Sequence, residues 1–516
     1  MEATIEFADI PARFRACAAR YGEAPALYDD SGVLDYGELD RLSDAMAGAL
    51  VGAGLRPGAR AALLCANGRE FVIAYLAILK AGATVVPINL LSSAQEVAYI
   101  LADAAPVLLL HQPAFAAVAE AACACCAGAP IRIELAADRP DFAALLAHPP
   151  LAPRSGAEVA AVLYTSGTTG RPKGAMLSHA NLIANAEGSW QGFELVPGDR
   201  LLVVLPLFHS FAATTAMLTP LLHGLAMIPV ARFEPRLVTQ AIARHGATVF
   251  LGVPSMYGVL LRHAEVLVEH WRGVRLCISG GAALPVALLR EFEARFEVIL
   301  LEGAGATECS PVFCVNRPSL PRKPGSIGPA LPGVELCVRD PAGQVLPRGE
   351  TGELCVRGPN VMHGYLGLPE ASREAFYDDW FRTGDLARID ADGHVYLVDR
   401  IKDLVITNGM NVYPRVVEEA LYAHPAIAEV AVVGDPDPKH GEVVVAHVSL
   451  VAGAEVSTAA LRAWCRDRLG AHEVPRRLVQ HDALPKNASG KILKRALRRY
   501  GVETAADGPP EGGASV

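Results

Sequence analysis

A loop rich in glycine and hydroxyl side chains separates an apolar segment from a segment with a helix cap. It reads Tyr164-Thr-Ser-Gly-Thr-Thr-Gly-Arg-Pro-Lys-Gly174 and follows the apolar residues 158–164. Glycine lets the backbone approach an anion closely, so that amide, hydroxyl and lysine groups can point at phosphate oxygens. Ser178 is a typical N-cap residue and predicts a helix directly after the loop. This order of segments predicts an α/β fold with a polyphosphate site.

The loop differs from a Walker loop in the position of its lysine. Lys173 lies three residues after Gly170 and is followed by Gly174 instead of serine or threonine. This spacing indicates a different nucleotide chemistry. The alternative, a flexible surface linker of the same composition, is disfavoured because linkers rarely join a buried strand to a capped helix.

The charge and length of the chain limit its partners and its organisation. With 516 residues, two or more domains are expected, and 52% hydrophobic residues suffice for compact cores. The formal net charge is −9, which argues against nucleic acid as the main partner. An anionic substrate must therefore be met by local positive charge.

The eleven cysteines are scattered along the chain and no secretory segment is recognised before them. We expect free thiols in a reducing compartment, and therefore a cytoplasmic protein. The cluster Cys123-Ala-Cys125-Cys126 lacks a second Cys/His pair at ligand spacing, so a metal is not expected there.

The most apolar long stretch spans residues 201–231. It contains Pro206, His209, Pro220 and His223, which are costly in a membrane-spanning helix, so we expect a buried wall instead. If the substrate is a lipid, peripheral contact with a membrane is an alternative, although no basic amphipathic helix indicates it.

The pattern of segments changes twice along the chain. Helical and strand-like segments alternate first, which predicts layered α/β subdomains with parallel strands. From about residue 325 to residue 400, short strands with Gly and Pro predict a small barrel-like subdomain. We therefore predict an N-terminal domain over residues 1–400, a small α+β lid domain over residues 401–502, and a disordered tail over residues 503–516.

Further motifs follow the loop in a fixed order. They are Leu205-Pro-Leu-Phe-His209, Ile278-Ser-Gly-Gly-Ala282, Glu302-Gly-Ala-Gly-Ala-Thr-Glu308, Trp380-Phe-Arg-Thr-Gly-Asp385, Asp399-Arg-Ile-Lys-Asp403 and Leu484-Pro-Lys-Asn-Ala-Ser-Gly-Lys491. Together with the loop, these motifs closely resemble the adenylate-forming superfamily of acyl-CoA synthetases, adenylation domains and luciferases, and most of all a fatty-acid–CoA ligase. The resemblance covers nearly the whole chain.

The resemblance implies a two-step reaction with ATP, Mg²⁺ and CoA. A carboxylate attacks the α-phosphate of ATP to give an acyl-adenylate and pyrophosphate, and a thiol then displaces AMP. Such a transition state needs charge neutralisation and positioning more than covalent help. The implied ligands of the β- and γ-phosphates lie in the loop and are Thr165, Ser166, Gly167, Thr168, Thr169, Gly170 and Lys173.

Five other positions match functional residues of the family. By resemblance, Glu308 would bind Mg²⁺ beside Thr307, and Asp385 with Arg400 would bind the ribose hydroxyls. Lys491 matches the mobile lysine that bridges the substrate carboxylate and ATP during adenylation.

Two positions match the moving parts of the family. Lys402 corresponds to the hinge on which the lid turns between the half-reactions, and Gly409 to the wall of the pantetheine tunnel. Gly409 alone would equally fit a turn between strands.

The implied acid pocket is apolar and uncharged. Amino-acid adenylation domains carry an Asp where this chain has His209, so an amino acid is disfavoured. The pocket comprises residues 208–217, 253–257, 280–283 and 304–306, among them Gly281 and Ala282. This composition favours an alkyl or aryl acid, with a fatty acid as first choice. A core role of His209 is the alternative to contact with the substrate.

The sequence departs from the family pattern at two places. Ala304 occupies the position of an aromatic residue that stacks on adenine, and His472-Glu473 replaces a Tyr-Lys pair near the presumed CoA entrance. A lost aromatic stack costs ~1 to 3 kcal/mol. The alternatives to a CoA ligase are therefore an enzyme that loads a carrier protein and a weakly catalytic homologue. The oligomeric state is not predicted.

Overall fold

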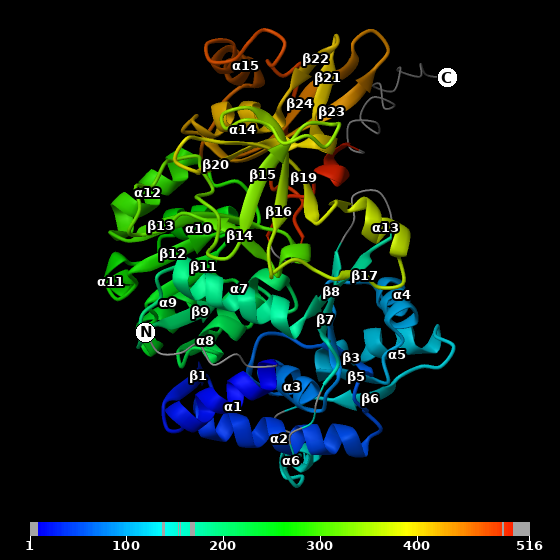
Figure 1. Ribbon diagram of the computed structural model, residues 1–516. Helices are drawn as coiled ribbons and strands as arrows, with labels where there is room; N and C mark the ends of the chain where they lie inside the picture. The colour runs from blue at the N-terminus through cyan, green and yellow to red at the C-terminus, as the bar shows by residue number, and fades with distance from the viewer. Residues whose placement is uncertain are drawn as a thin grey trace, which may run out of the picture.

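Two mostly parallel sheets form the N-terminal part of the protein. The computed structural model describes residues 9–136, 140–152, 154, 156–165, 171–487 and 490–498. One sheet has eight strands in the order β14-β13-β12-β11-β9-β10-β1-β2, and the other has seven in the order β17-β8-β7-β4-β3-β5-β6. Helices connect the parallel strands and cover the sheets (Figure 1). The predicted layered α/β fold is confirmed.

The strands of the eight-stranded sheet are β1 Pro25–Asp29, β2 Gly32–Asp35, β9 Arg200–Val203, β10 Ala226–Pro229, β11 Val249–Gly252, β12 Leu276–Ser279, β13 Ile299–Gly305 and β14 Val312–Val315. Those of the seven-stranded sheet are β3 Arg60–Leu64, β4 Thr84–Pro87, β5 Leu108–His111, β6 Ile131–Glu134, β7 Val159–Thr165, β8 Lys173–Ser178 and β17 Gly364–Tyr365.

The helices of this part are α1 Ile10–Tyr21, α2 Tyr36–Gly52, α3 Arg69–Lys80, α4 Ala94–Ala104, α5 Ala116–Ala124, α6 Pro140–Leu146, α7 His179–Gly192, α8 Thr219–Leu221, α9 Pro235–His245, α10 Pro254–Arg262, α11 Val268–Trp271, α12 Val286–Phe296 and α13 Pro369–Glu374. Shorter helical turns are η1 Pro113–Phe115, the π-helical η2 Ala212–Leu218, and η3 Thr307–Cys309.

The helix predicted after the glycine-rich loop is present as α7. Its N-cap Ser178 accepts a hydrogen bond from the backbone of Asn181, whose side chain accepts one from the backbone of Ser178 in return. This reciprocal capping satisfies two otherwise unpaired donors and typically contributes about 1 kcal/mol. The helix start is thus fixed where the sequence places it.

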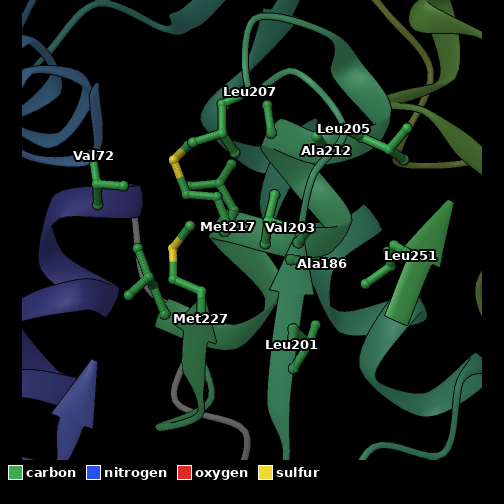
Figure 2. Packing of buried hydrophobic residues seen from close by; sticks show 14 of the residues in the cluster. Val72, Ala186, Leu201, Val203, Leu205, Leu207, Ala212, Met217, Met227 and Leu251 are labelled. Carbon is green, nitrogen blue, oxygen red and sulfur yellow. The ribbon is translucent and has the colours of Figure 1, made fainter. Parts of the chain in front are cut away.

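The apolar stretch 201–231 lies at the centre of the large domain. Figure 2 shows Leu201 and Val203 of β9 and Met227 of β10 packed with Met217 of η2, and all four side chains are buried. The predicted buried wall is therefore confirmed.

A third sheet follows, with antiparallel strands in the order β15-β16-β19-β18 and β20 paired to β19. Its strands are β15 Glu335–Arg339, β16 Thr351–Arg357, β18 Phe376–Tyr377, β19 Trp380–Ile389 and β20 Val395–Arg400. It lies between the large domain and the C-terminal part (Figure 1). The predicted short antiparallel strands are present, and β20 extends to Arg400.

The C-terminal part forms a separate small α+β unit beyond the turn η4 Ile401–Asp403. Its strands and helices are β21 Val405–Thr407, β22 Met410–Val412, α14 Pro414–Tyr422, β23 Ile427–Asp437, β24 Gly441–Leu450, α15 Thr458–Arg466 and β25 Arg477–His481. We call this unit the lid. The expected disordered tail, residues 503–516, lies outside the described residues.

Candidate active site

The carboxyl ends of four neighbouring parallel strands converge on one edge of the eight-stranded sheet. The strands β9, β11, β12 and β13 are adjacent in that sheet. The segments that follow them carry His209, Val253, Gly280 and Thr307. Ligands of open α/β sheets bind outside the carboxyl ends of the strands. This edge is the candidate active site.

The ends of the glycine-rich loop are held together by strand pairing. Thr165 closes β7 and faces Lys173, which opens β8, and the Thr165 hydroxyl lies 3.4 Å from the Lys173 carbonyl oxygen. The predicted phosphate ligands Ser166, Gly167, Thr168, Thr169 and Gly170 lie outside the described residues. The structure therefore describes the two residues that flank these ligands, Thr165 and Lys173.

Glu308, the predicted metal ligand, has a partner that the sequence motifs do not include. The Tyr365 hydroxyl donates a hydrogen bond to Glu308 at 2.9 Å, and the ammonium of Lys173 lies 5.0 Å from the centre of the Tyr365 ring. Burial and the neighbouring Glu308 raise the pKa of Tyr365, so it remains a donor. Tyr365 reaches this place because β17 pairs with β8, where it faces Ala175.

The residue before Glu308 is also fixed by a side chain outside the motifs. The hydroxyls of Thr307 and the buried Ser210 lie 3.2 Å apart. Ser210 directly follows His209, so this contact ties the segment after β9 to the segment after β13.

Asp385 and Arg400 face each other across β19 and β20. Their side chains form an ion pair with a distance of 3.1 Å between Arg400 Nε and Asp385 Oδ1. Burial raises the pKa of Asp385, whereas Arg400, Lys491 and Lys402 lower it in part. The structure thus brings together the two residues predicted to bind the ribose.

Lys491 of the lid reaches into the same site. Burial and the nearby Arg400 lower the pKa of its ammonium to about 8, while Asp385 opposes this shift. The loop before it is anchored to the large domain, because the Ser255 hydroxyl donates to the Gly490 carbonyl at 3.1 Å. Asn487 accepts a hydrogen bond from the Lys491 backbone at 2.9 Å. The lid is therefore closed over the site.

His209 is a neutral side chain in this setting. Burial and the charge of Lys491 lower its pKa to about 4. Its Nδ1 accepts a hydrogen bond of 3.3 Å from the backbone of Phe211, so the other ring nitrogen carries the proton. The Phe211 ring lies against Gly280, where an added Cβ would come within 3.1 Å of it.

The next predicted residues, Gly281 and Ala282, lie in an exposed turn after β12. Gly281 has a φ of +77°, which favours glycine, and an added Cβ would lie 3.5 Å from Val253. The buried Glu302 fixes the end of this turn, because it accepts a hydrogen bond of 2.9 Å from the Leu284 backbone. Burial raises the pKa of Glu302 to about 7.

Ala304, at the position of the missing aromatic ring, lies in β13 opposite Cys314 and is half-buried.

Lys402 lies in η4, which begins directly after Arg400, and burial followed by the charge of Arg400 lowers the pKa of Lys402. Gly409 has a φ of +78° in the two-residue turn between β21 and β22, and an added Cβ would meet no atom within 4 Å. Gly409 therefore occupies a turn of the lid in this closed arrangement.

Within the described parts of the chain, the structure contains no group of three or more His, Cys, Asp or Glu side chains that could hold a metal. No described helix has the length and apolarity needed to cross a membrane.

Two family models match the chain. The model of the AMP-binding enzyme covers residues 14–366, and that of the AMP-binding enzyme C-terminal domain covers residues 416–491. The site and the two-part fold define an adenylate-forming enzyme. The chain belongs to the AMP-binding enzyme family and is an enzyme of the acyl-CoA ligase type.

Relatives that are named as CoA synthases or ligases match most of the chain. It is 37% identical over 477 residues to feruloyl-CoA synthase from Amycolatopsis sp, spanning 92% of this chain and 96% of that protein. It is 40% identical over 343 residues to a long-chain-fatty-acid–CoA ligase from Bacillus subtilis, spanning 66% and 61%. ATP-bound MatB from Rhodopseudomonas palustris superimposes with a TM-score of 0.88 at 34% identity, over 95% and 99% of the two chains.

Proposed function

We propose that this protein activates an apolar monocarboxylic acid, with a fatty acid as first candidate, and transfers the acyl group to CoA. In the first step an acid oxygen attacks the α-phosphorus of ATP, and pyrophosphate leaves. In the second step the CoA sulfur attacks the acyl carbon, and AMP leaves. The observation that carries this proposal is the half-buried Lys491, held by the closed lid beside Asp385 and His209.

Each assembled group has a distinct task in this proposal. Asp385 and Arg400 bind the ribose, and Lys491 neutralises charge between the acid and the α-phosphate in the first step. Lys173 and Thr165, with residues 166–170 between them, bind the outer phosphates. After pyrophosphate leaves, the lid turns at Lys402, and Gly409 then approaches the pantetheine arm.

Magnesium fits the donor set at Glu308. Mg²⁺ usually keeps several waters and is bound by one or two carboxylates together with substrate phosphates. The single carboxylate of Glu308, next to the Thr307 hydroxyl, meets this requirement without a cluster of protein ligands. The ion would neutralise charge on the phosphates, and Tyr365 would fix the orientation of the carboxylate.

The groups gathered around Gly280 support an apolar acid. The Phe211 ring and the Val253 side chain lie against the glycine pair 280–281, and His209 is neutral. A second carboxylate on the substrate would lose its hydration without gaining a partner there. Aryl acids are the second candidate, because the feruloyl-CoA synthase relative spans 92% of this chain.

A screen of pyrophosphate release tests the proposal. Purified protein with ATP and magnesium is offered saturated fatty acids of increasing length, aryl acids, dicarboxylic acids and amino acids, with and without CoA. We expect pyrophosphate with alkyl or aryl monocarboxylates, and AMP turnover that rises when CoA is added. Dicarboxylates as sole substrates would refute the pocket assignment, and no AMP with any acid would refute the activity.

The acceptor and the catalytic competence are tested in the same assay. Adenylate formation without acceleration by CoA would favour transfer to a carrier protein. The weakly catalytic alternative rests on Ala304 and on the pair His472-Glu473, and it predicts a very high KM for ATP.

A further inference from the structure

Two cysteines face each other on the third sheet, beside the strand that carries the motif from Trp380 to Asp385. In the antiparallel pair β15–β16, Cys337 lies directly opposite Cys355. The facing pairs on either side join opposite charges, Glu335 with Arg357 and Arg339 with Glu353. Because side chains alternate along a strand, all three pairs project from the same face. The two thiols therefore lie between two pairs of oppositely charged side chains.

The spacing of the two thiols suits a disulfide. Facing residues of antiparallel strands have Cα atoms about 4.5 to 5.5 Å apart, and disulfides join Cα atoms about 4.4 to 6.8 Å apart. The Cys355 thiol donates to the Glu353 carbonyl oxygen at 3.7 Å, and it projects from the same face of the sheet as the Cys337 thiol. No shift of the strands is needed to join them.

The two arginines beside the pair are held in place by aromatic rings. The Arg357 guanidinium lies 4.5 Å from the centre of the Trp380 ring, and that of Arg339 lies 5.5 Å from it. The neighbouring Cys355, followed by Arg339 and Arg357, lowers the pKa of the Cys337 thiol. The neighbouring Cys337 and burial raise the pKa of Cys355. Cys337 is partly exposed, whereas Cys355, opposite it in the sheet, is buried.

We propose that Cys337 and Cys355 form a peroxide-reactive dithiol site that closes to a disulfide. The Cys337 thiolate attacks one oxygen of hydrogen peroxide, the O–O bond breaks, and the released hydroxide takes up a proton as water. Cys355 then attacks the sulfur of the resulting sulfenic acid. The S–S bond forms, the S–O bond breaks, and the oxygen leaves as a second water with the Cys355 proton. Both thiols are oxidised, and one peroxide is reduced.

The other cysteines provide an internal comparison. Burial raises the pKa of Cys277, Cys309 and Cys314, which favours unreactive thiols. Cys125 is exposed, so peroxide reaches it freely. Its rate of oxidation measures the effect of access alone, and the rate at Cys337 measures access together with the arginine environment.

Mass spectrometry of the full-length protein tests the proposal. The reduced protein is treated with hydrogen peroxide, quenched with an alkylating reagent at successive times, and digested. We expect a peptide pair linked through residues 337 and 355, formed on the order of tenfold faster than oxidation of Cys125. Dithiothreitol should restore both free thiols. Oxidation of Cys125 before Cys337, or no linked pair, would overturn the proposal.

Three variants separate the roles of the groups. Cys355→Ser should leave Cys337 as a lasting sulfenic acid that a 1,3-dione reagent labels, whereas the natural protein should show only brief labelling. Arg339→Gln should slow oxidation of Cys337, and the control Arg348→Gln, in the same subdomain, should not. Circular dichroism verifies that each variant is folded. Equal labelling in the natural protein and Cys355→Ser, or equal rates in both arginine variants, would contradict the assignment.

Discussion

The hydroxyl group of Tyr365 donates a hydrogen bond of 2.9 Å to Oε1 of Glu308, and its ring lies beneath the ammonium of Lys173. One tyrosine thus contacts both the proposed metal ligand and the proposed phosphate ligand. Glu308 lies in the turn η3 and Lys173 in β8, and Tyr365 contacts both. Tyr365 is therefore a positioning residue for the charged groups around the phosphates.

Replacing Tyr365 by Phe removes the hydroxyl and keeps the ring under Lys173. A hydrogen bond to a charged group contributes roughly 1.5 to 3 kcal/mol, so we expect kcat/KM for magnesium·ATP to fall on the order of tenfold. Steady-state kinetics at varied magnesium measures this effect. Tyr365→Leu, which also removes the ring, should lose more. A lower KM for magnesium in Tyr365→Phe would mean that the hydroxyl competes with the ion.

Replacing Lys491 by Ala should separate the two half-reactions. In the proposed function its charge serves only the first step, so adenylate formation should fall on the order of a hundredfold or more. Thioester formation from supplied acyl-adenylate should change little. Pyrophosphate exchange and CoA-ester formation measure the two steps separately, and an equal loss in both would remove Lys491 from its assigned role.

The pH dependence of the first step should depend on the same side chain. The pKa of Lys491 is about 8, so its charge is present below that pH and is lost as pH rises through it. We expect kcat/KM for ATP in adenylate formation to decline above pH 8, since this parameter reports the free enzyme. Lys491→Arg, which stays charged, should lack the decline. The same decline in both proteins would assign it to another group.

Restoring an aromatic ring at Ala304 should improve ATP binding. Stacking on a base contributes ~1 to 3 kcal/mol, so Ala304→Tyr should lower the KM for ATP on the order of tenfold. A thermal unfolding curve verifies that the larger side chain is tolerated. An unchanged or higher KM in a folded variant would indicate that another group already covers the adenine.

Glu302 should make folding stability depend on pH. Its folded pKa of about 7 lies above the ordinary value of 4.5, so the folded state binds the proton more tightly. Its stabilising contribution is present below pH 4.5 and is lost as pH rises through 7. Glu302→Gln keeps a side-chain oxygen that can accept the hydrogen bond from the Leu284 backbone. The Tm of this variant should exceed that of the natural protein by a few degrees at pH 8. No such gain at pH 8 would argue against a buried charge.

The sequence predicted the architecture well because its signals are local. Apolar runs mark the strands, Ser178 marks the start of α7, and the change in pattern near residue 325 precedes the antiparallel sheet. Tyr365 and Ser210 could not be predicted in the same way. Tyr365 reaches Glu308 through the pairing of β17 with β8, which are distant in the sequence, and Ser210 contacts Thr307 although β9 and β13, the strands before them, are not adjacent in the sheet. The functional roles of the motif residues remain predictions, since they depend on bound substrates.

Two ion pairs fasten the segment after Lys491 to the rest of the lid and to its base. Lys494 pairs with Glu418 of α14 at 2.8 Å, and Arg498 pairs with Asp403 at 3.2 Å. A rotation of the lid at residues 401–403 would therefore move the Lys491 side chain together with the rest of the lid. Asp385 lies in β19, outside the lid, and would not move with it. In the proposed function, Lys491 would thereby leave the site between the two steps, while Asp385 would stay at the ribose.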